Sequence, residues 1–128
     1  MQFLVMVKKN GAGRAMYERG EWPENIHEEF ENMGAFNETL AKDGFKILDM
    51  GGLKPTSSAT RIDFTDAKKP KTIDGPFAEC KELVGGFWLL EAPSKEALVE
   101  RLSHAPMPFG ETLEIRPLFS EEDLAAIG

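Results

Sequence analysis

The sequence predicts an α+β fold of the ferredoxin-like class, with the element order β-α-β-β-α-β and an inserted hairpin. Three observations support this prediction. The 128 residues suit one domain that spans residues 1–128. Apolar residues recur with the period of strands in some segments and of helices in others. Glycine and proline clusters separate these segments.

The first part of the chain predicts a strand, a long loop and a helix. Residues 2–8 alternate as a strand, and residues 10–23 are expected to form a loop rich in glycine and charge. A helix is expected over about residues 24–42, with Asn25 and Glu28 as a cap pair at its start. Its apolar stripe has spacings of three and four residues and consists of Ile26, Phe30, Met33, Phe36 and Leu40.

The middle of the chain predicts further strands. Residues 45–50 and 59–64 alternate, and after a polar turn we expect residues 71–73 to return as a short hairpin strand. Residues 83–92 form a strongly apolar run that predicts another strand. The pair Gly85-Gly86 inside this run indicates a bulge or a close approach to the backbone.

The last part of the chain predicts a helix, a strand and a short helix. Ser94 is expected to cap a helix over residues 95–105, and Pro106 ends it because proline disfavours helical geometry in the preceding residue. Residues 112–119 alternate as the last strand. The segment of residues 120–123, which begins with Ser120, is typical of the capped start of a short C-terminal helix.

The predicted sheet has both helices on one face, so its other face needs a cover. The strands at residues 2–8 and 83–92 are apolar on both faces, and a large exposed apolar patch is unusual for a monomer. We therefore expect a homodimer that packs two sheets face to face about a two-fold axis. Alternatively, residues 10–23 and the C-terminal segment cover this face within one chain.

Charge and composition exclude several classes of protein. The net charge of −7 argues against binding to nucleic acid or to an anionic membrane. The lone cysteine, Cys80, excludes an intrachain disulfide, and no apolar stretch approaches the ~20 residues that span a bilayer, so we expect a cytoplasmic protein. No cofactor motif is found, and we expect neither cofactor nor metal. His27 and Glu31 share a helix face, but two ligands alone rarely hold a metal ion.

Residues 74–82, with the sequence DGPFAECKE, are followed by Gly85-Gly86-Phe87. This pattern resembles the signature of the DGPF-domain family, one of the YCII-related domains, and the resemblance covers nearly the whole chain. Cys80 departs from the small polar residue expected there. The resemblance implies a dimeric α+β barrel. It also implies enzymes with acid–base residues in a cleft beside the sheet, and some members resemble partners of extracytoplasmic-function sigma factors.

The signature contains charged candidates for catalysis. Asp74 is either a turn-forming residue or a general base, since Asp-Gly-Pro forms tight turns. Glu79 and Glu82 are close enough in sequence to split their pKa values and act as acid and base. Lys81 between them is a candidate for binding substrate, or it forms a structural ion-pair network with both carboxylates.

Three further residues are candidates outside the signature. Arg116 suits the clamping of a substrate carboxylate, or it pairs with Glu114 on the same strand face. Arg61 has the same two interpretations, with Asp63 as its partner. His27 is a candidate proton shuttle or a solvated surface residue among glutamates.

Two classes of function follow. The first is a small cofactor-independent enzyme of the lyase or isomerase type, or a binder of a small polar or carboxylated molecule. The alternative is a non-catalytic regulatory module, such as a sigma-factor partner. Residues 18–43 carry eight acids and two bases, and this acidic segment would suit a basic partner.

Overall fold

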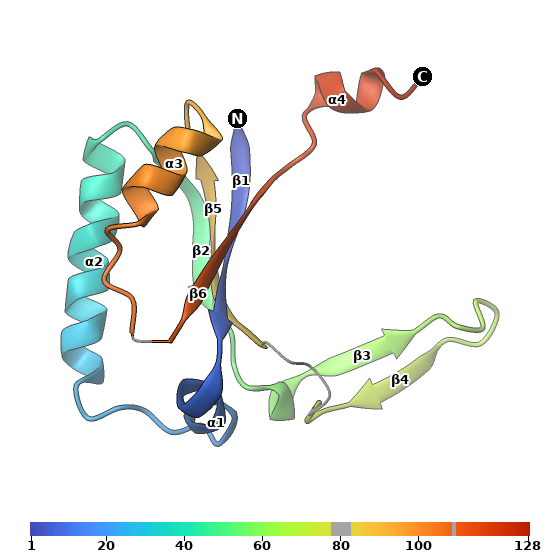
Figure 1. The fold of residues 1–128 in the computed structure, drawn as a ribbon. Coiled ribbons are helices and arrows are strands. Elements are labelled where there is room, and N and C mark those ends of the chain that lie inside the picture. The colour runs from blue at the N-terminus through green and yellow to red at the C-terminus, as the bar shows by residue number, and fades with distance from the viewer. Residues whose placement is uncertain (78–82, 109) are drawn as a thin grey trace.

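The computed structural model describes residues 1–77, 83–108 and 110–128, and it shows one sheet with two helices on one of its faces (Figure 1). The sheet is antiparallel and has the strand order β2-β5-β1-β6. Its strands are β1 (Gln2–Lys9), β2 (Lys46–Gly52), β5 (Leu83–Glu91) and β6 (Thr112–Pro117). Helices α2 (Ile26–Lys42) and α3 (Lys95–Leu102) cover one face. The ferredoxin-like fold class is therefore confirmed.

The predicted inserted hairpin is also present. Strands β3 (Thr60–Asp63) and β4 (Lys71–Asp74) pair antiparallel as a separate two-stranded sheet. A short 3-10 helix, η1 (Thr56–Ser58), leads into them. Figure 1 shows that the hairpin extends away from the body on the side opposite α2 and α3.

The loop predicted over residues 10–23 is wrong in its first half, where Gly11–Glu18 form helix α1. Two glycines lower the helix propensity of this segment, which is why its pattern indicates a loop. Tertiary contacts override that propensity. Tyr17 and Glu18, in the last turn of the helix, hydrogen-bond to residues 53–56.

The predicted caps at Ser94 and Ser120 are confirmed, because each hydroxyl accepts a backbone N–H from three residues further along. Ser120 thereby starts helix α4 (Glu121–Ala125). The cap pair predicted for Asn25 and Glu28 is wrong. Asn25 makes no side-chain cap hydrogen bond, since its backbone (φ −93°, ψ 22°) lacks the extended conformation of an N-cap residue.

The core lies between the sheet and helices α2 and α3. Its most deeply buried side chains are Phe3, Val5, Leu40, Leu90 and Leu98. Trp88 also lies in this core, and its indole N–H donates to Asn37 Oδ1 at 2.9 Å. This bond satisfies the polar atom of a buried tryptophan.

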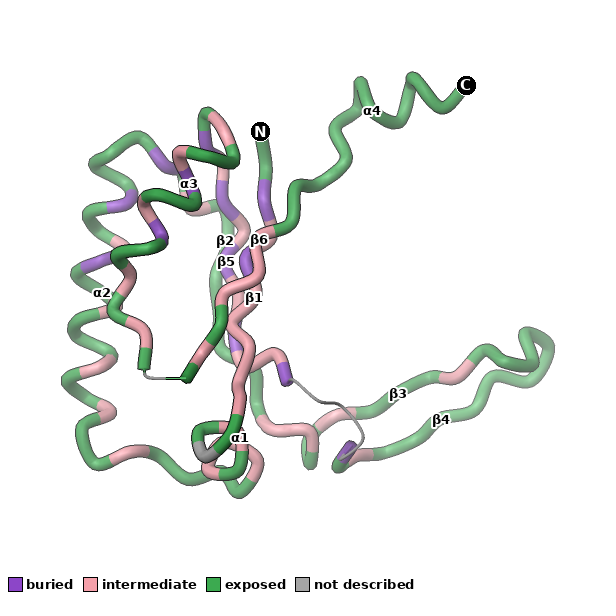
Figure 2. The backbone as a smooth tube through the Cα atoms, viewed as in Figure 1, coloured by how far each residue is buried: buried purple, intermediate pink, exposed green. Residues whose placement is uncertain are grey.

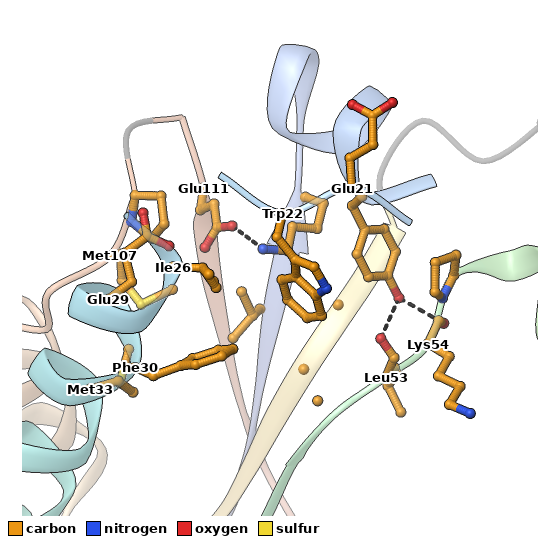
Figure 3. A pocket seen from close by; sticks show the side chains of 18 of the residues that line it. Glu21, Trp22, Ile26, Glu29, Phe30, Met33, Leu53, Lys54, Met107 and Glu111 are labelled. Carbon is orange, nitrogen blue, oxygen red and sulfur yellow. Dashed lines mark hydrogen bonds and ion pairs between the residues drawn. The ribbon is translucent and has the colours of Figure 1, made fainter. Parts of the chain in front are cut away.

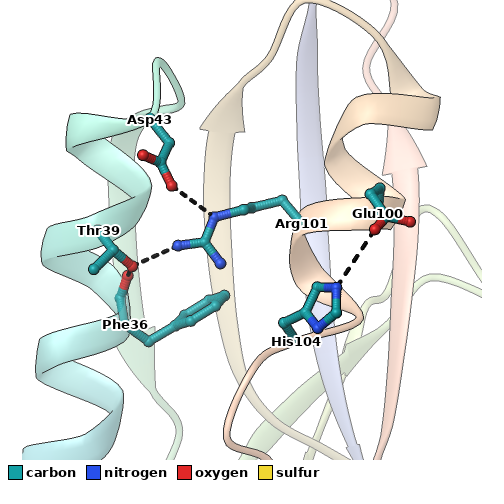
Figure 4. Close-up of polar contacts among 6 residues, drawn as sticks. All are labelled: Phe36, Thr39, Asp43, Glu100, Arg101 and His104. Atoms are coloured by element: carbon teal, nitrogen blue, oxygen red, sulfur yellow. Dashed lines mark hydrogen bonds and ion pairs between the residues drawn. The ribbon is translucent and has the colours of Figure 1, made fainter.

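Arg101 of α3 fastens the two helices to each other (Figure 4). Its guanidinium donates to Asp43 Oδ2 at 3.1 Å and to the Thr39 hydroxyl, and it lies 4.8 Å from the centroid of the Phe36 ring. These contacts fix α3 against the C-terminal half of α2. The exposed His104 pairs with Glu100 one helical turn away.

The second face of the sheet has no cover within the described chain. On this face Leu4 lies opposite Leu89, and Met6 lies opposite Phe87. Arg116 is paired with Leu4 on the same face. The C-terminal segment does not fold back here but extends away into solvent (Figures 1 and 2), so the intrachain cover is not what the structure shows. We call this surface the open face.

Candidate functional site

A cleft of about 440 Å³ lies between the N-terminal half of α2 and one end of the sheet (Figure 3). Figure 3 shows Phe30 and Met33 of α2 on one side and Leu53 and Lys54 on the other, with Trp22 between them. The lining is mostly apolar. Such a cleft, with few polar groups, is the usual form of a small-molecule site.

One ion pair lies in this apolar cleft. Lys9, the last residue of β1, pairs its ammonium with the carboxylate of Glu111, which immediately precedes β6. The Glu111 side chain is only 7% exposed, and that of Lys9 is 24% exposed. The Lys9 ammonium also lies 5.9 Å from the centroid of the Tyr17 ring. The pair therefore places opposite charges against apolar walls, where screening by water is weak.

Gly85 makes the position of Lys9 possible. A Cβ atom on Gly85 would lie 2.7 Å from Lys9 Cε and 2.9 Å from Lys9 Cγ. The methylene groups of Lys9 thus pass over β5 at Gly85, a position that has no side chain. The bulge or close backbone approach predicted at Gly85-Gly86 is confirmed, because the pairing of β5 with β1 skips Gly85 and a Cβ atom on Gly86 would lie 3.1 Å from the Gly51 carbonyl oxygen. At Gly85 the neighbouring group is the Lys9 side chain, which enters the cleft.

Tyr17 connects α1 to the opposite wall. Its hydroxyl lies 2.9 Å from the Leu53 carbonyl and 2.8 Å from the Lys54 carbonyl, and its single proton serves one of them at a time. Burial raises the pKa of Tyr17 above its ordinary value, and the neighbouring Glu18 carboxylate raises it further. Tyr17 therefore stays neutral at physiological pH and holds the cleft wall in place.

A spectroscopic titration tests this assignment, because Tyr17 is the only tyrosine in the chain. The tyrosinate absorbance should develop at a higher pH in the folded protein than in the same protein in urea. Since the folded-state pKa is the higher one, the associated stability is present below the ordinary pKa of about 10 and is lost as pH rises through the raised value. If the tyrosinate titration had the same midpoint in the folded and the urea-unfolded protein, the assignment of Tyr17 as a buried residue that holds the cleft wall would be contradicted.

Two aromatic rings form the mouth of the cleft. Trp22 and Phe30 meet edge to face, with centroids 5.8 Å apart and planes at 73°. They remain 70% and 55% exposed, which is unusual for rings of this size. A ligand entering the cleft would cover both rings and gain from their burial.

The first residues of the signature pack against η1, beside the cleft. Gly75 packs on η1 so closely that a Cβ atom there would lie 1.8 Å from the Thr56 carbonyl oxygen. The Phe77 N–H donates to Thr56 Oγ1 at 3.2 Å. Thr56 in turn donates its own N–H and hydroxyl to the Glu18 carboxylate. The turn therefore holds η1 and α1 together beside the cleft.

Of the candidate residues that the structure describes, Asp74 and Arg61 lie on the hairpin, Arg116 on the open face and His27 on α2. Asp74 is exposed on the hairpin and accepts a hydrogen bond from Thr60 at 2.8 Å. The Arg61 guanidinium lies 3.7 Å from the centroid of the Phe77 ring. Arg116 is exposed on the open face.

His27 is exposed in the first turn of α2, and the described lining of the cleft contains neither it nor Asp74, Arg61 or Arg116. Glu79, Lys81 and Glu82 lie outside the described residues. The catalytic and binding roles assigned to these seven residues stay predictions.

Sequence reasoning missed Lys9 and Glu111 because they are 102 positions apart and share no local pattern. Two signals pointed toward the cleft. The segment 10–23 holds Tyr17 and Trp22, aromatic residues that stand out in a polar stretch. The pair Gly85-Gly86 indicated a bulge or a close backbone approach in the strand that borders the cleft.

Residues 1–77, 83–108 and 110–128 contain neither a metal-binding cluster nor a membrane-spanning helix. No group of three or more His, Cys, Asp or Glu residues in this part of the chain is placed to hold a metal ion. None of its helices is long and apolar enough to cross a membrane.

The fold and the cleft define a small α+β protein with a ligand-sized site beside a ferredoxin-like sheet. Residues 1–122 match the YCII-related domain, and the chain belongs to this family. A comparison with curated proteins gives no match. Among solved structures, the chain is similar to the 5-chloro-2-hydroxyhydroquinone dehydrochlorinase from Burkholderia phenoliruptrix AC1100 in complex with 2,5-dihydroxybenzoquinone. The TM-score is 0.44 and the identity 16%, over 96% of this chain and 99% of that chain.

Proposed function

We propose that this YCII-related protein binds a small molecule with an apolar body and one carboxylate or other polar oxygen in the cleft. The observation that carries the proposal is the Lys9–Glu111 pair within apolar walls. A lysine ammonium has three donor protons, and Glu111 engages only part of this capacity. A ligand oxygen would take another proton of Lys9, while its apolar part would lie against Trp22 and Phe30.

The same pair suits proton-transfer chemistry, so we propose a cofactor-independent lyase or isomerase as the enzyme class. Glu111 would accept a proton from a carbon next to a carbonyl, breaking the C–H bond and leaving an enolate. Lys9 would stabilise the negative charge that develops on the carbonyl oxygen. The proton would return to another carbon in an isomerase, or a leaving group would depart in a lyase.

Benzoate is a suitable probe of the binding site, because it combines an apolar ring with one carboxylate. We expect benzoate to shift the indole N–H signal of Trp22 in NMR spectra at lower concentration than benzyl alcohol, its neutral counterpart. Lys9→Met should lower the affinity for benzoate relative to benzyl alcohol about tenfold, since the charge-assisted bond is lost. Lys95→Met, a change at an exposed lysine on α3, is the matched control.

The proposal fails if the wild-type protein binds the two probes equally, or if Lys9→Met and Lys95→Met behave alike. The Trp22 signal reports on the cleft alone, because Trp22 lines it and lies away from the open face. Benzoate that merely adsorbed to the open face would not shift the Trp22 signal.

We also propose that the chain belongs to the DGPF branch of the family and that it forms a homodimer. The branch assignment rests on residues 74–82, and the dimer rests on the apolar open face. A cytoplasmic location and a sigma-factor partner stay predictions. The acidic helix α2 would be the surface for such a partner.

A further inference from the structure

Two arms project from the body on the same side as the open face (Figure 1). We call residues 60–74 the hairpin arm and residues 118–128 the tail arm. The tail arm leaves the sheet beside the start of β1, where the Leu118 N–H donates to the Gln2 carbonyl at 2.9 Å. The hairpin arm follows Gly52, which pairs with Gly86 near the other end of β1. The arms therefore flank the open face from opposite ends of the strands.

Each arm is too small to be stable by itself. An isolated two-stranded hairpin is marginal in water, and α4 has only five residues, far below the length of a stable isolated helix. Both arms nevertheless expose large apolar side chains, from 43% to 75% exposed. These are Ile62, Phe64 and Ile73 on the hairpin arm and Phe119, Leu124 and Ile127 on the tail arm. Exposed apolar side chains gathered in this way mark a surface that another protein surface covers.

The charges of the two arms are complementary. The hairpin tip, residues 66–71, carries three lysines and one aspartate. The tail arm carries Glu121, Glu122 and Asp123 and no basic side chain. Opposite charges favour contact between a hairpin and a tail, whereas two tails or two hairpins repel each other.

This charge pattern selects between the two ways of packing the open faces. A two-fold axis parallel to the strands would bring like arms of two subunits to the same end. An axis across the strands would bring each hairpin arm to the tail arm of the other subunit. We infer that the axis runs across the strands and that each hairpin arm docks on the partner's tail arm. This inference rests on the proposed homodimer and adds its geometry and the elements that hold it.

In this arrangement the lysines of the hairpin tip face the acids at the start of α4. The apolar side chains of the two arms cover one another beneath the charges. Because a two-fold interface is isologous, the contact forms twice in each dimer. The arms therefore extend the interface beyond the sheet and specify its register.

Charge reversal on each arm tests the pairing. We expect Lys68→Glu with Lys69→Glu, and separately Glu121→Lys with Glu122→Lys, to weaken the dimer at least about tenfold in sedimentation equilibrium at low salt. The chain with all four substitutions should regain most of the lost affinity, because the charges are opposite again. Lys95→Glu, on the far side of the molecule, should have no effect. Asp123 is left intact because it belongs to the cap of α4.

Cysteine cross-linking gives an independent geometric readout. With Cys80 replaced by serine, we expect a mixture of Lys69→Cys and Glu122→Cys chains to form a disulfide-linked heterodimer under mild oxidation. Each variant alone should stay uncross-linked. If Lys69→Cys cross-links to itself instead, like arms meet and the inferred axis is wrong.

The outcomes separate this inference from the proposals beneath it. A wild-type protein that is monomeric at every concentration overturns both the homodimer and the pairing of its arms. A stable dimer that is insensitive to both charge reversals, or is not restored by the fourfold variant, overturns the arm pairing alone. Binding of benzoate in the cleft is unaffected by either result.

Discussion

Replacing Gly75 by alanine should destabilise the protein by about 3 kcal/mol or more. The added methyl group would stand 1.8 Å from the Thr56 carbonyl oxygen and 3.3 Å from that of Ala59. Both obstacles are backbone atoms, so no side-chain rotation relieves the clash. The Gly75 N–H also donates to the Ala59 carbonyl at 2.8 Å, and moving the turn would break this bond.

Urea unfolding followed by circular dichroism measures this effect, with Gly34→Ala as the matched control. Gly34 lies within α2, and a Cβ atom there would meet nothing within 4 Å. The same chemical change should therefore stabilise the protein by about 0.5–1 kcal/mol at Gly34. If Gly75→Ala retained the wild-type midpoint, the signature turn would not pack on η1 as described.

The order of strands and helices was predictable because its signals are local. The stripe from Ile26 to Leu40 and the alternation in β1 each report which face of an element is buried. Helix α1 was not predictable in this way. Its glycines favour a loop, and the contacts of Tyr17 and Glu18 that stabilise it come from a segment about three dozen residues away.

The candidate site was predictable only in outline. The signature stands out as a string of letters, and its charges attract a catalytic interpretation. In the part of the signature that the structure describes, Gly75 and Phe77 contribute packing and a backbone hydrogen bond beside the cleft. The charged pair in the cleft joins β1 to the residue before β6, strands that are neighbours only in the folded sheet. A single sequence carries no signal for such a pairing.

Leu89 and Leu90 are consecutive residues of β5 that face opposite sides of the sheet, so truncating them should have different consequences. Leu90 is fully buried at the centre of the core, and Leu90→Ala should lower the free energy of unfolding by about 2–5 kcal/mol. Leu89 lies on the open face opposite Leu4. Leu89→Ala should cost the isolated subunit less, because this partly buried side chain buries less apolar area than Leu90 does.

Measurement at several protein concentrations separates the two effects. The stability lost in Leu90→Ala should be nearly independent of concentration, since the cavity lies within one subunit. For Leu89→Ala the loss should appear mainly as a weaker dimer, so it should be largest at high protein concentration and shrink on dilution toward the small cost to the isolated subunit. Equal, concentration-independent losses for the two variants would mean that nothing covers the open face in solution. That result would remove the homodimer while leaving the core and the cleft as they are.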